Sequence, residues 1–210
     1  KYMNRILEVN VKERWVRVQP GVVLDEMNAF LKPYHLHFAP DPATGNRATI
    51  GGMIGNNSSG SRSIIYGIMQ DHVLETKTIL SDGSVFNFGE VHIENHISEL
   101  KKTNEREYRL ISGFKKIIDE NREDISKTFP KILRRVQGYN LDAFIHNDNW
   151  NLSSLLTGSE GSLGVVLNAR LNLEPLPVRK ILCAVHYENL PECIRSVALI
   201  LEHGPSAVEI

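Results

Sequence analysis

Apolar and polar residues recur along this chain in patterns that predict both strands and helices. Residues 14–18 and 165–173 alternate between apolar and polar side chains, which is typical of a strand with one buried face. In residues 23–32 the apolar side chains recur at helical spacing, and Pro33 would end that helix. The chain is therefore predicted to have an α+β fold.

Residues 71–80 and 84–88 are predicted to pair as an antiparallel hairpin around Ser81-Asp82-Gly83. Asp-Gly favours the positive φ angles of a tight two-residue turn. Further segments are predicted to be extended, at residues 36–39, 152–157, 180–187 and 207–210, and residues 191–203 are predicted to be a helix.

Residues 92–150 differ from the rest of the chain because their charge density is higher and their apolar residues recur at helical spacing. These apolar residues are Tyr108, Ile111, Phe114, Ile117 and Ile118. The pattern predicts an inserted helical segment whose charged face is solvated rather than a binding patch.

Residues 49–60 contain four glycines and five small polar residues, and none of them is charged. Thr49 occupies an N-cap position, and Ile50 is predicted to begin a short helix. The first-turn amides, at Ile50, Gly51 and Gly52, would have no partner within that helix and would favour an anion. The side chains that add hydrogen-bonding groups are Asn56, Asn57, Ser58 and Ser59. A phosphate-bearing or heteroaromatic ligand would suit this surface; a tight glycine turn packed on a neighbouring strand is the alternative.

Residues 155–166 form a second glycine-rich segment, with Gly158, Gly161 and Gly164 spaced three residues apart. A buried strand is predicted to enter this turn and to leave it as the alternating strand. Three glycines would let the backbone approach a flat ligand closely. Glu160 could bond a ligand hydroxyl or backbone amides, or have a structural role in the turn.

Two nucleotide-binding motifs are excluded. The P-loop fails because Ser61 and Arg62 follow Gly60 where a lysine and a serine or threonine are required. The nicotinamide dinucleotide motif fails because the glycines of the second segment do not have the G-x-G-x-x-G spacing.

Composition is ordinary for a globular protein, with 210 residues, 41% hydrophobic, 23% charged and a formal net charge of −1. Nothing in it suggests a nucleic acid or an anionic membrane as a partner, and no apolar run is long enough to span a bilayer. The chain begins without Met and stops in a predicted strand, so we expect an internal fragment of a larger protein.

Cysteine and histidine do not predict a metal site. The two cysteines, Cys183 and Cys193, cannot alone hold a cluster or a structural zinc, and we expect buried, reduced thiols. His35 and His37 share one side of a predicted extended segment, but a third ligand is missing. Further histidines are expected to pack in the interior (His72) or to lie at the surface (His186 and His203).

The motifs Pro40-Asp41-Pro42, Tyr66-Gly67 and Asp71-His72-Val73, together with residues 49–60 and 157–164, resemble the FAD-linked oxidase family. This family has the FAD-binding domain of the vanillyl-alcohol-oxidase type. Further matching residues, at 3–8, 15–21 and 46–53, are similar to a bacterial branch with D-2-hydroxyglutarate or D-lactate-type dehydrogenase activity, in which the flavin domain is fused to an iron–sulfur domain. The resemblance covers about residues 2–174.

The resemblance implies FAD as cofactor and, as fold, the second lobe of this domain, with a mixed or antiparallel sheet flanked by helices. Residues 40–60 would line the isoalloxazine and pyrophosphate, and residues 160–166 would lie along the adenosine half or the ribityl chain. The cofactor-binding residues that it implies are Pro40, Asp41, Thr44, Thr49, Ile50, Gly51, Gly52, Asn56, Asn57, Ser58, Ser59, Gly60, Tyr66, Gly67, Asp71, Ser159, Glu160, Gly161, Gly164, Val165 and Val166.

The resemblance further implies that residues 1–175 are part of the FAD-binding domain, with the insertion at about 92–150, and that residues 176–210 begin a substrate domain. A D-2-hydroxy acid of the 2-hydroxyglutarate, lactate or glycolate type would transfer a hydride to the flavin. The catalytic base would lie outside this chain. The alternatives are a non-catalytic flavin-fold binding module and a flavin reductase of the cell-wall-precursor type, reduced by NADPH.

The family's Arg-Gly-Gly-Gly phosphate loop and its cysteine-rich iron–sulfur part do not occur in this sequence. We therefore expect these 210 residues alone to hold FAD weakly or not at all. The expected partners are a hydroxy-acid substrate and an electron acceptor, with an iron–sulfur cluster outside this chain. A homo-oligomer and a cytoplasmic location, free or at the inner membrane face, are further expectations.

Overall fold

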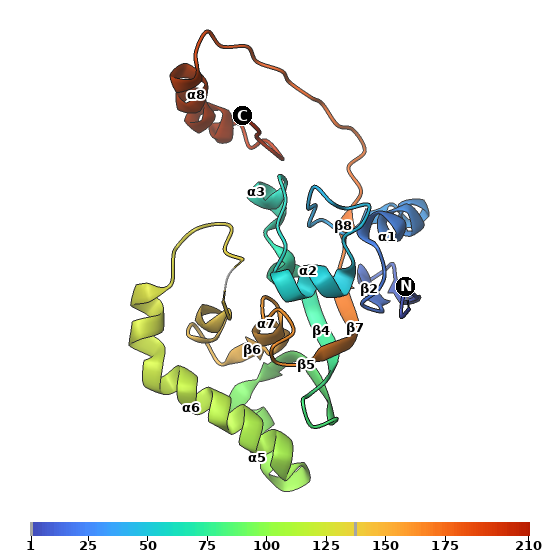
Figure 1. Ribbon diagram of the computed structural model, residues 1–210, viewed down its shortest axis with the longest axis vertical. Coiled ribbons are helices and arrows are strands. Elements are labelled where there is room, and N and C mark those ends of the chain that lie inside the picture. The colour runs from blue at the N-terminus through green and yellow to red at the C-terminus, as the bar shows by residue number, and fades with distance from the viewer. Residues whose placement is uncertain (1, 137) are drawn as a thin grey trace.

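An antiparallel sheet forms the centre of the computed structural model, which describes residues 2–136 and 138–210 (Figure 1). Within these residues the main sheet has six strands in the order β1-β2-β7-β4-β5-β6, and all neighbours are antiparallel. Its strands are β1 (Ile6–Asn10), β2 (Trp15–Val18), β4 (Val73–Ile79), β5 (Val85–His92), β6 (Asn149–Asn151) and β7 (Val165–Asn172). A smaller antiparallel pair joins β3 (Leu36–His37) to β8 (Glu174–Pro175). The predicted α+β class with an antiparallel sheet is confirmed.

Helices lie around this sheet, except α8, which lies apart from it at the end of a long irregular segment (Figure 1). They are α1 (Leu24–Leu31), α2 (Ile50–Asn56), α3 (Ser63–Tyr66), α4 (Met69–His72), α5 (Ile93–Thr103), α6 (Glu105–Thr128), α7 (Ser153–Leu156) and α8 (Leu190–Glu202), with 3-10 turns at Lys32–Tyr34 and Leu141–Phe144. The predicted helices at 23–32 and 191–203 are therefore confirmed.

One face of the sheet packs against α1 and α2 and forms the larger core. Strand β7 contributes Ala169 and Leu171 to it, and both are at most 1% exposed. Helix α1 contributes its predicted apolar stripe of Leu24, Met27 and Leu31. Burying each such side chain stabilises the fold by about 1.5–3 kcal/mol. This packing fixes α2 on the sheet and thus positions the first glycine-rich segment.

The predicted helical insertion is confirmed as α5 and α6, which build a second core against β5. Ile111 and Ile118 of α6 are buried in this core, whereas Ile117 is 53% exposed. The rings of Phe144 and Trp150 meet edge to face with centroids 5.1 Å apart. The other face of α6 carries ion pairs between residues four apart, so its charges are solvated as predicted.

The predicted hairpin of β4 and β5 is present, but its turn is longer than the two residues expected. Leu80 donates its N–H to Ser84 at 2.9 Å, so three residues form the loop between them. Within this loop Gly83 has a positive φ of 84°. A left-handed residue at the third loop position is the usual geometry of three-residue hairpin loops.

The predicted strand at 152–157 is wrong, because most of this segment forms the short helix α7. Asn151 accepts the N–H of Ser153 through its side chain at 3.1 Å, and the hydroxyl of Ser153 donates to the carbonyl of Val73 at 2.9 Å. Thr157 closes the helical turn by donating its N–H to Ser153 at 3.0 Å. Local hydrogen bonds of Asn and Ser thus replace pairing with a strand.

The predicted strand at 180–187 is also wrong, since these residues run in irregular structure. Ile181 and Leu182 are 95% and 94% exposed. Cys183 is exposed and Cys193 is half-buried, so the expectation of two buried thiols is not met. Residues 207–210 likewise form no strand. Without a neighbouring strand, an apolar run has no partner for its backbone groups.

Candidate functional site

The first glycine-rich segment forms the predicted helix, α2, which has seven residues. Thr49 is its N-cap, because the Thr49 hydroxyl accepts the N–H of Gly52 at 3.4 Å. Ile50 and Ile54 turn into the larger core, where each is at most 1% exposed. Asn57 ends the helix in the left-handed conformation, with φ at 54°. The other face of α2 is left for contact with a ligand or with the rest of the chain.

The first-turn amides of α2 are engaged by the protein, so the prediction that they are available to an anion is wrong. Ile50 donates its N–H to the carbonyl of Val22 at 2.8 Å, and Gly51 donates to that of Pro20 at 2.8 Å. A Cβ on Gly51 would lie 2.6 Å from the Cβ of Pro20. The turn between β2 and α1 thus fills the position that an anion would take. The segment is thus a helix whose first turn packs on the loop after β2, and not the glycine turn on a strand that was the alternative.

The two glycine-rich segments meet at the C-terminal end of α2, next to α7 (Figure 1). Gly158 donates its N–H to the carbonyl of Ile54 at 2.8 Å, and Glu160 donates to that of Gly55 at 2.9 Å. Gly158 has φ at 90°, and a Cβ there would lie 3.2 Å from the carbonyl oxygen of Gly138. This position therefore requires glycine. The backbone of Glu160 has a structural role, while its exposed side chain stays open to a ligand.

A buried pair of asparagines holds this junction together. Asn57, which is 1% exposed, donates to the carbonyl of Arg135 at 3.2 Å and accepts the N–H of Gln70 at 3.0 Å. Asn140, also 1% exposed, donates to the carbonyl of Thr157 at 2.6 Å. Because protein groups engage the amide of Asn57, its burial is explained without a ligand.

Both glycine-rich segments are contacted by residues 134–136 and 138–140. The sequence alone did not identify these as site residues. Arg134 donates to the carbonyl of Ser61 at 3.5 Å, and the Tyr139 hydroxyl lies 2.9 Å from that of Ser162. The sequence pattern predicts that these residues lie within the helical insertion. Pro130 and the turn-forming residues around position 138 could have indicated that the helix had already ended.

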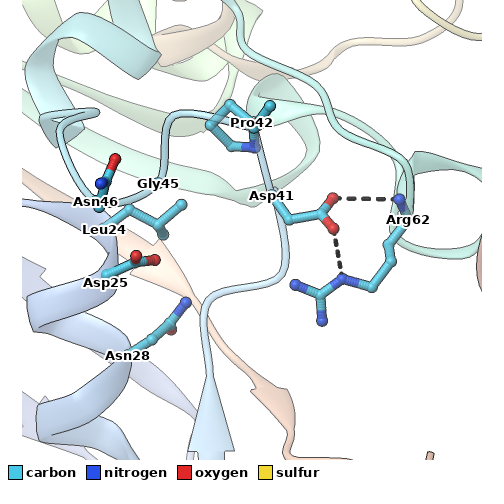
Figure 2. Close-up of a pocket in the computed structure, with 9 residues that line it drawn as sticks. Leu24, Asp25, Asn28, Asp41, Pro42, Gly45, Asn46 and Arg62 are labelled. Carbon is cyan, nitrogen blue, oxygen red and sulfur yellow. Dashed lines mark hydrogen bonds and ion pairs between the residues drawn. The ribbon is translucent and has the colours of Figure 1, made fainter.

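Asp41 and Arg62 join the loop before α2 to the segment after it (Figure 2). The carboxylate of Asp41 accepts from the side-chain Nε of Arg62 at 2.6 Å and from the backbone N–H of Arg62 at 3.2 Å. A Cβ on Gly60 would lie 2.2 Å from the carbonyl oxygen of Asp41, so the two segments pack closely. Asp41 therefore has a structural partner, which the resemblance did not indicate.

A polar hollow of about 330 Å³ lies beside this ion pair (Figure 2). It is lined by Leu24, Asp25, Asn28, Asp41, Pro42, Ala43, Gly45, Asn46 and Arg62. Its charged groups are two aspartates and one arginine, which sum to a formal charge of −1. A negative lining disfavours a pyrophosphate, so the hollow does not suit that part of FAD.

Tyr66, Gly67 and Asp71 lie in a turn that its own hydrogen bonds hold. The carboxylate of Asp71 accepts the N–H of Ile68 at 2.8 Å and thereby caps α4. The side-chain Nε2 of His72 lies 2.7 Å from the carbonyl of Tyr66. His72 is 3% exposed, so its predicted role in packing is confirmed.

His37 is a buried histidine beneath this region. Its Nδ1 lies 3.2 Å from the carbonyl of Glu174, and its ring meets that of Tyr66 edge to face at 5.6 Å. Its Nε2 is buried and has no hydrogen-bond partner among the residues that the structure describes. Burial lowers the pKa of His37, and the charge of Arg62 lowers it further. The imidazole is therefore neutral near pH 7.

The rest of the second segment is held by short local contacts. Ser162 donates its hydroxyl to the carbonyl of Ser159 at 2.6 Å, and Ser159 is 7% exposed. Gly164 packs against β4, where a Cβ would lie 2.7 Å from the carbonyl oxygen of Ile79. Val165 is 64% exposed, so the alternation of β7 buries only the later apolar residues.

Exposure divides the residues that the resemblance implies for the cofactor. Those exposed are Thr44, Gly52, Asn56, Asp71, Glu160, Gly161 and Val165. Those half-buried are Asp41, Thr49, Gly51, Ser59, Gly60, Tyr66, Gly67, Gly164 and Val166. Those buried are Pro40, Ile50, Asn57, Ser58 and Ser159. A side chain of the last group could reach a cofactor only after the surrounding structure had moved.

Within residues 2–136 and 138–210, no group of three or more histidine, cysteine or acidic side chains could hold a metal ion. His35 and His37 differ in exposure, with His35 exposed and His37 buried. In the same described ranges, no helix is both long and apolar enough to span a bilayer.

Comparison with known proteins finds a matching family model and similar relatives. The model of an FAD binding domain matches residues 1–89, which include α2 and the Asp41–Arg62 pair. The D-2-hydroxyglutarate dehydrogenase of Pseudomonas putida is 40% identical over the whole of this chain, and that of Haemophilus influenzae is 38% identical. The chain is thus similar to members of the FAD-linked oxidase family over its whole length, and residues 1–89 match the FAD binding domain itself. It spans about 21% of the length of each of these two relatives.

A solved structure supports the fold. An alkyldihydroxyacetonephosphate synthase matches with a TM-score of 0.50 and 20% identity, over 84% of this chain and 22% of the other. At this identity the likeness concerns the fold alone. The predicted resemblance to the family is confirmed by the family model and by the relatives.

Proposed function

We propose that this chain is part of an FAD-dependent dehydrogenase that oxidises a D-2-hydroxy acid. The observation that carries the proposal is the meeting of two glycine-rich segments, with Gly158 and Glu160 bonded to the last turn of α2, in a chain whose residues 1–89 match an FAD binding domain. The relatives that match the whole chain are named D-2-hydroxyglutarate dehydrogenases, which favours 2-hydroxyglutarate as the substrate.

The residues around the junction fit the uncharged, hydrogen-bonding parts of FAD. Gly52, Asn56 and Gly161 are exposed, and residues 49–60 contain no charged side chain. The exposed glycines allow a flat ring or a ribityl chain to approach the backbone. Fewer groups here suit the pyrophosphate, because the first-turn amides of α2 already donate to protein carbonyls and the neighbouring hollow is acidic.

Bound FAD would accept a hydride from the carbon that carries the substrate hydroxyl. This chain would bind and orient the flavin, and the exposed residues of the two segments would provide the contacts. Asn57 and Asn140 would hold the segments in register, since each spans the junction by buried hydrogen bonds. The catalytic base and the residues that contact the substrate would lie outside this chain.

Further parts of the proposal concern the whole protein. Residues 1–175 would belong to the FAD-binding domain, with the insertion at about 92–150, and residues 176–210 would begin a substrate domain. The whole protein would also have an iron–sulfur cluster outside this chain and use a separate electron acceptor. It would form a homo-oligomer and lie in the cytoplasm.

The proposal is tested with the natural full-length protein. Purified protein is expected to show a flavin absorbance spectrum and to reduce a dye acceptor with D-2-hydroxyglutarate but not with the L-enantiomer. A flavin-loaded protein that no 2-hydroxy acid reduces would favour a binding module. Reduction of the flavin by NADPH would favour a reductase.

The 210 residues alone are expected to bind FAD more weakly than the natural protein, because few groups here suit the pyrophosphate. Flavin fluorescence titration of both proteins measures the difference. A stoichiometric yellow cofactor on the 210 residues would contradict this expectation.

A further inference from the structure

An apolar slot of about 550 Å³ lies beside the junction, between the C-terminal end of α6 and the 3-10 turn at residues 141–144. It is lined by Thr128, Phe129, Pro130, Ile132, Arg134, Arg135, Val136, Gly138, Tyr139 and Leu141. Most of this lining is apolar, and Ile132 is 63% exposed at its edge. The slot therefore suits a ring with a large apolar face.

Arg135 lines this slot, is held by several contacts and retains an unused donor. Its guanidinium lies 4.7 Å from the centre of the Phe129 ring, and its Nη2 donates to Asn140 at 3.1 Å and to the carboxylate of Asp142. Its Nη1 is buried and has no hydrogen-bond partner within residues 2–136 and 138–210. A buried donor without an acceptor costs about 1–3 kcal/mol, so an acceptor from a ligand would stabilise this arrangement.

The slot is continuous with the proposed cofactor site. The carbonyl of Arg135 accepts from Asn57, at the end of α2. Tyr139, which also lines the slot, is hydrogen-bonded to Ser162 of the second glycine-rich segment. A ligand in the slot would therefore touch residues that contact both segments.

We propose that the isoalloxazine ring of FAD occupies this slot and that Nη1 of Arg135 donates to one of its ring carbonyl oxygens. The inference rests on the proposed function, which supplies the cofactor, and it assigns residues that neither the resemblance nor the family match identifies. The isoalloxazine combines a broad apolar face with carbonyl acceptors at one edge. A phosphate would lose its hydration against an apolar lining.

The charge of Arg135 adds an electronic effect to the hydrogen bond. Reduction increases the electron density on the pyrimidine part of the flavin, where the carbonyl oxygens lie. A cation there stabilises the reduced form and raises the midpoint potential of the flavin. The potential is therefore a readout that a purely structural role of Arg135 would leave unchanged.

The test uses the natural full-length protein and the variants Arg135→Gln and Arg135→Lys. Arg135→Gln is expected to bind FAD about tenfold more weakly or worse, and to shift the midpoint potential to a more negative value. Arg135→Lys keeps the charge but loses the planar fork, so its affinity should fall while its potential stays nearer to that of the parent. Lys131→Gln, an exposed residue of the same segment that does not line the slot, is the matched control and should change neither quantity.

A second variant protects the test against loss of folding. Ile132→Trp fills the slot from its exposed edge without touching the hydrogen bonds of Arg135, and thermal melting of the apoprotein checks that it folds. It should weaken the binding of FAD and FMN but leave the binding of ADP unchanged. If the parent binds FAD while Arg135→Gln and Ile132→Trp bind it equally well, the inference is wrong and the proposed function stands.

Titration with ADP tests whether the slot binds the adenosine end of FAD instead of the isoalloxazine. If both variants weaken the binding of ADP as much as they weaken the binding of FMN, the slot holds the adenosine end of FAD, and the assignment of the isoalloxazine is overturned. If the parent itself binds no FAD, the proposed function fails, and the inference fails with it.

Discussion

Strand β7 and residues 180–187 are both short and rich in apolar side chains, but their surroundings differ completely. Strand β7 lies between β2 and β4 and pairs with both. Its Leu171 is fully buried, whereas Ile181 is 95% exposed. Residues 180–187 form no strand and contribute no residue to either apolar core.

The difference shows that an apolar segment becomes a strand only when neighbours satisfy its backbone and cover its side chains. For β7 both conditions are met by segments that lie up to about 150 residues away in the sequence, as the contact from Asn168 to Arg17 illustrates.

The largest expected effect is the loss of an apolar contact in β7. Leu171→Ala should lower the free energy of unfolding of the 210-residue chain by about 2–5 kcal/mol, because it leaves a cavity in the larger core. Ile181→Ala should change it by less than about 0.5 kcal/mol. Urea unfolding followed by circular dichroism measures both. Equal effects would mean that residues 180–187 are packed in solution.

A smaller difference is expected between two glycines of the second segment. Gly158→Ala should cost about 1–3 kcal/mol, because φ is 90° and the new Cβ would crowd the carbonyl of Gly138. Gly161 also has a positive φ, of 77°, but a Cβ there would meet nothing within 4 Å. Gly161→Ala should therefore cost only the backbone strain of about 1–2 kcal/mol. The same unfolding assay checks the order, and a larger loss at Gly161 would refute the packing described for Gly158.

The pH dependence of stability should distinguish His37 from an exposed histidine. Because the folded pKa of His37 lies below its ordinary value of 6.5, the unfolded chain binds the proton more readily. The stabilising effect is fully present above pH 6.5 and is lost as the pH falls toward the folded pKa. His37→Gln should flatten this part of the stability profile, and His186→Gln, at an exposed residue, should not.

The smallest effect is expected from ion pairs. Glu75 contacts Arg17 at 2.9 Å and Arg170 at 3.6 Å, and its side chain is 25% exposed. Glu75→Gln should lower the free energy of unfolding by about 1 kcal/mol, which is at the upper end of the range for partly exposed ion pairs. Glu123 pairs with Lys127 on the exposed face of α6, and Glu123→Gln should change stability by less than about 0.5 kcal/mol. Chemical denaturation at low and high salt tests both, and a cost at Glu123 that matches or exceeds that at Glu75 would contradict this order.

Much of the local structure could be predicted because it depends on nearby residues. The apolar stripe of α1, the N-cap at Thr49 and the hairpin around Asp82-Gly83 all act within a few positions, and the structure contains each of them, although the hairpin loop has three residues instead of two. The strand expected at 152–157 was wrong because Asn151 and Ser153 provide local hydrogen bonds that favour a helical turn. Hydrophobicity alone does not distinguish these outcomes.

The candidate site was predicted less completely than the fold. Both glycine-rich segments were found from their composition, but composition could not show that they bond to each other. Arg135 and Asn140 were missed because they lie within a charged insertion, and only the folded chain brings them to Asn57.

The sequence by itself determined the fold class, the helical insertion, the glycine-rich segments and the resemblance to the FAD-linked oxidases. These rest on periodicity and on motifs, which neighbouring residues carry. The tertiary structure alone decided that the first turn of α2 is capped by Pro20 and Val22, and that the two segments meet at its last turn. The reason is that backbone amides look alike in any sequence. Whether an amide is free for a ligand depends on which distant carbonyl the fold brings to it.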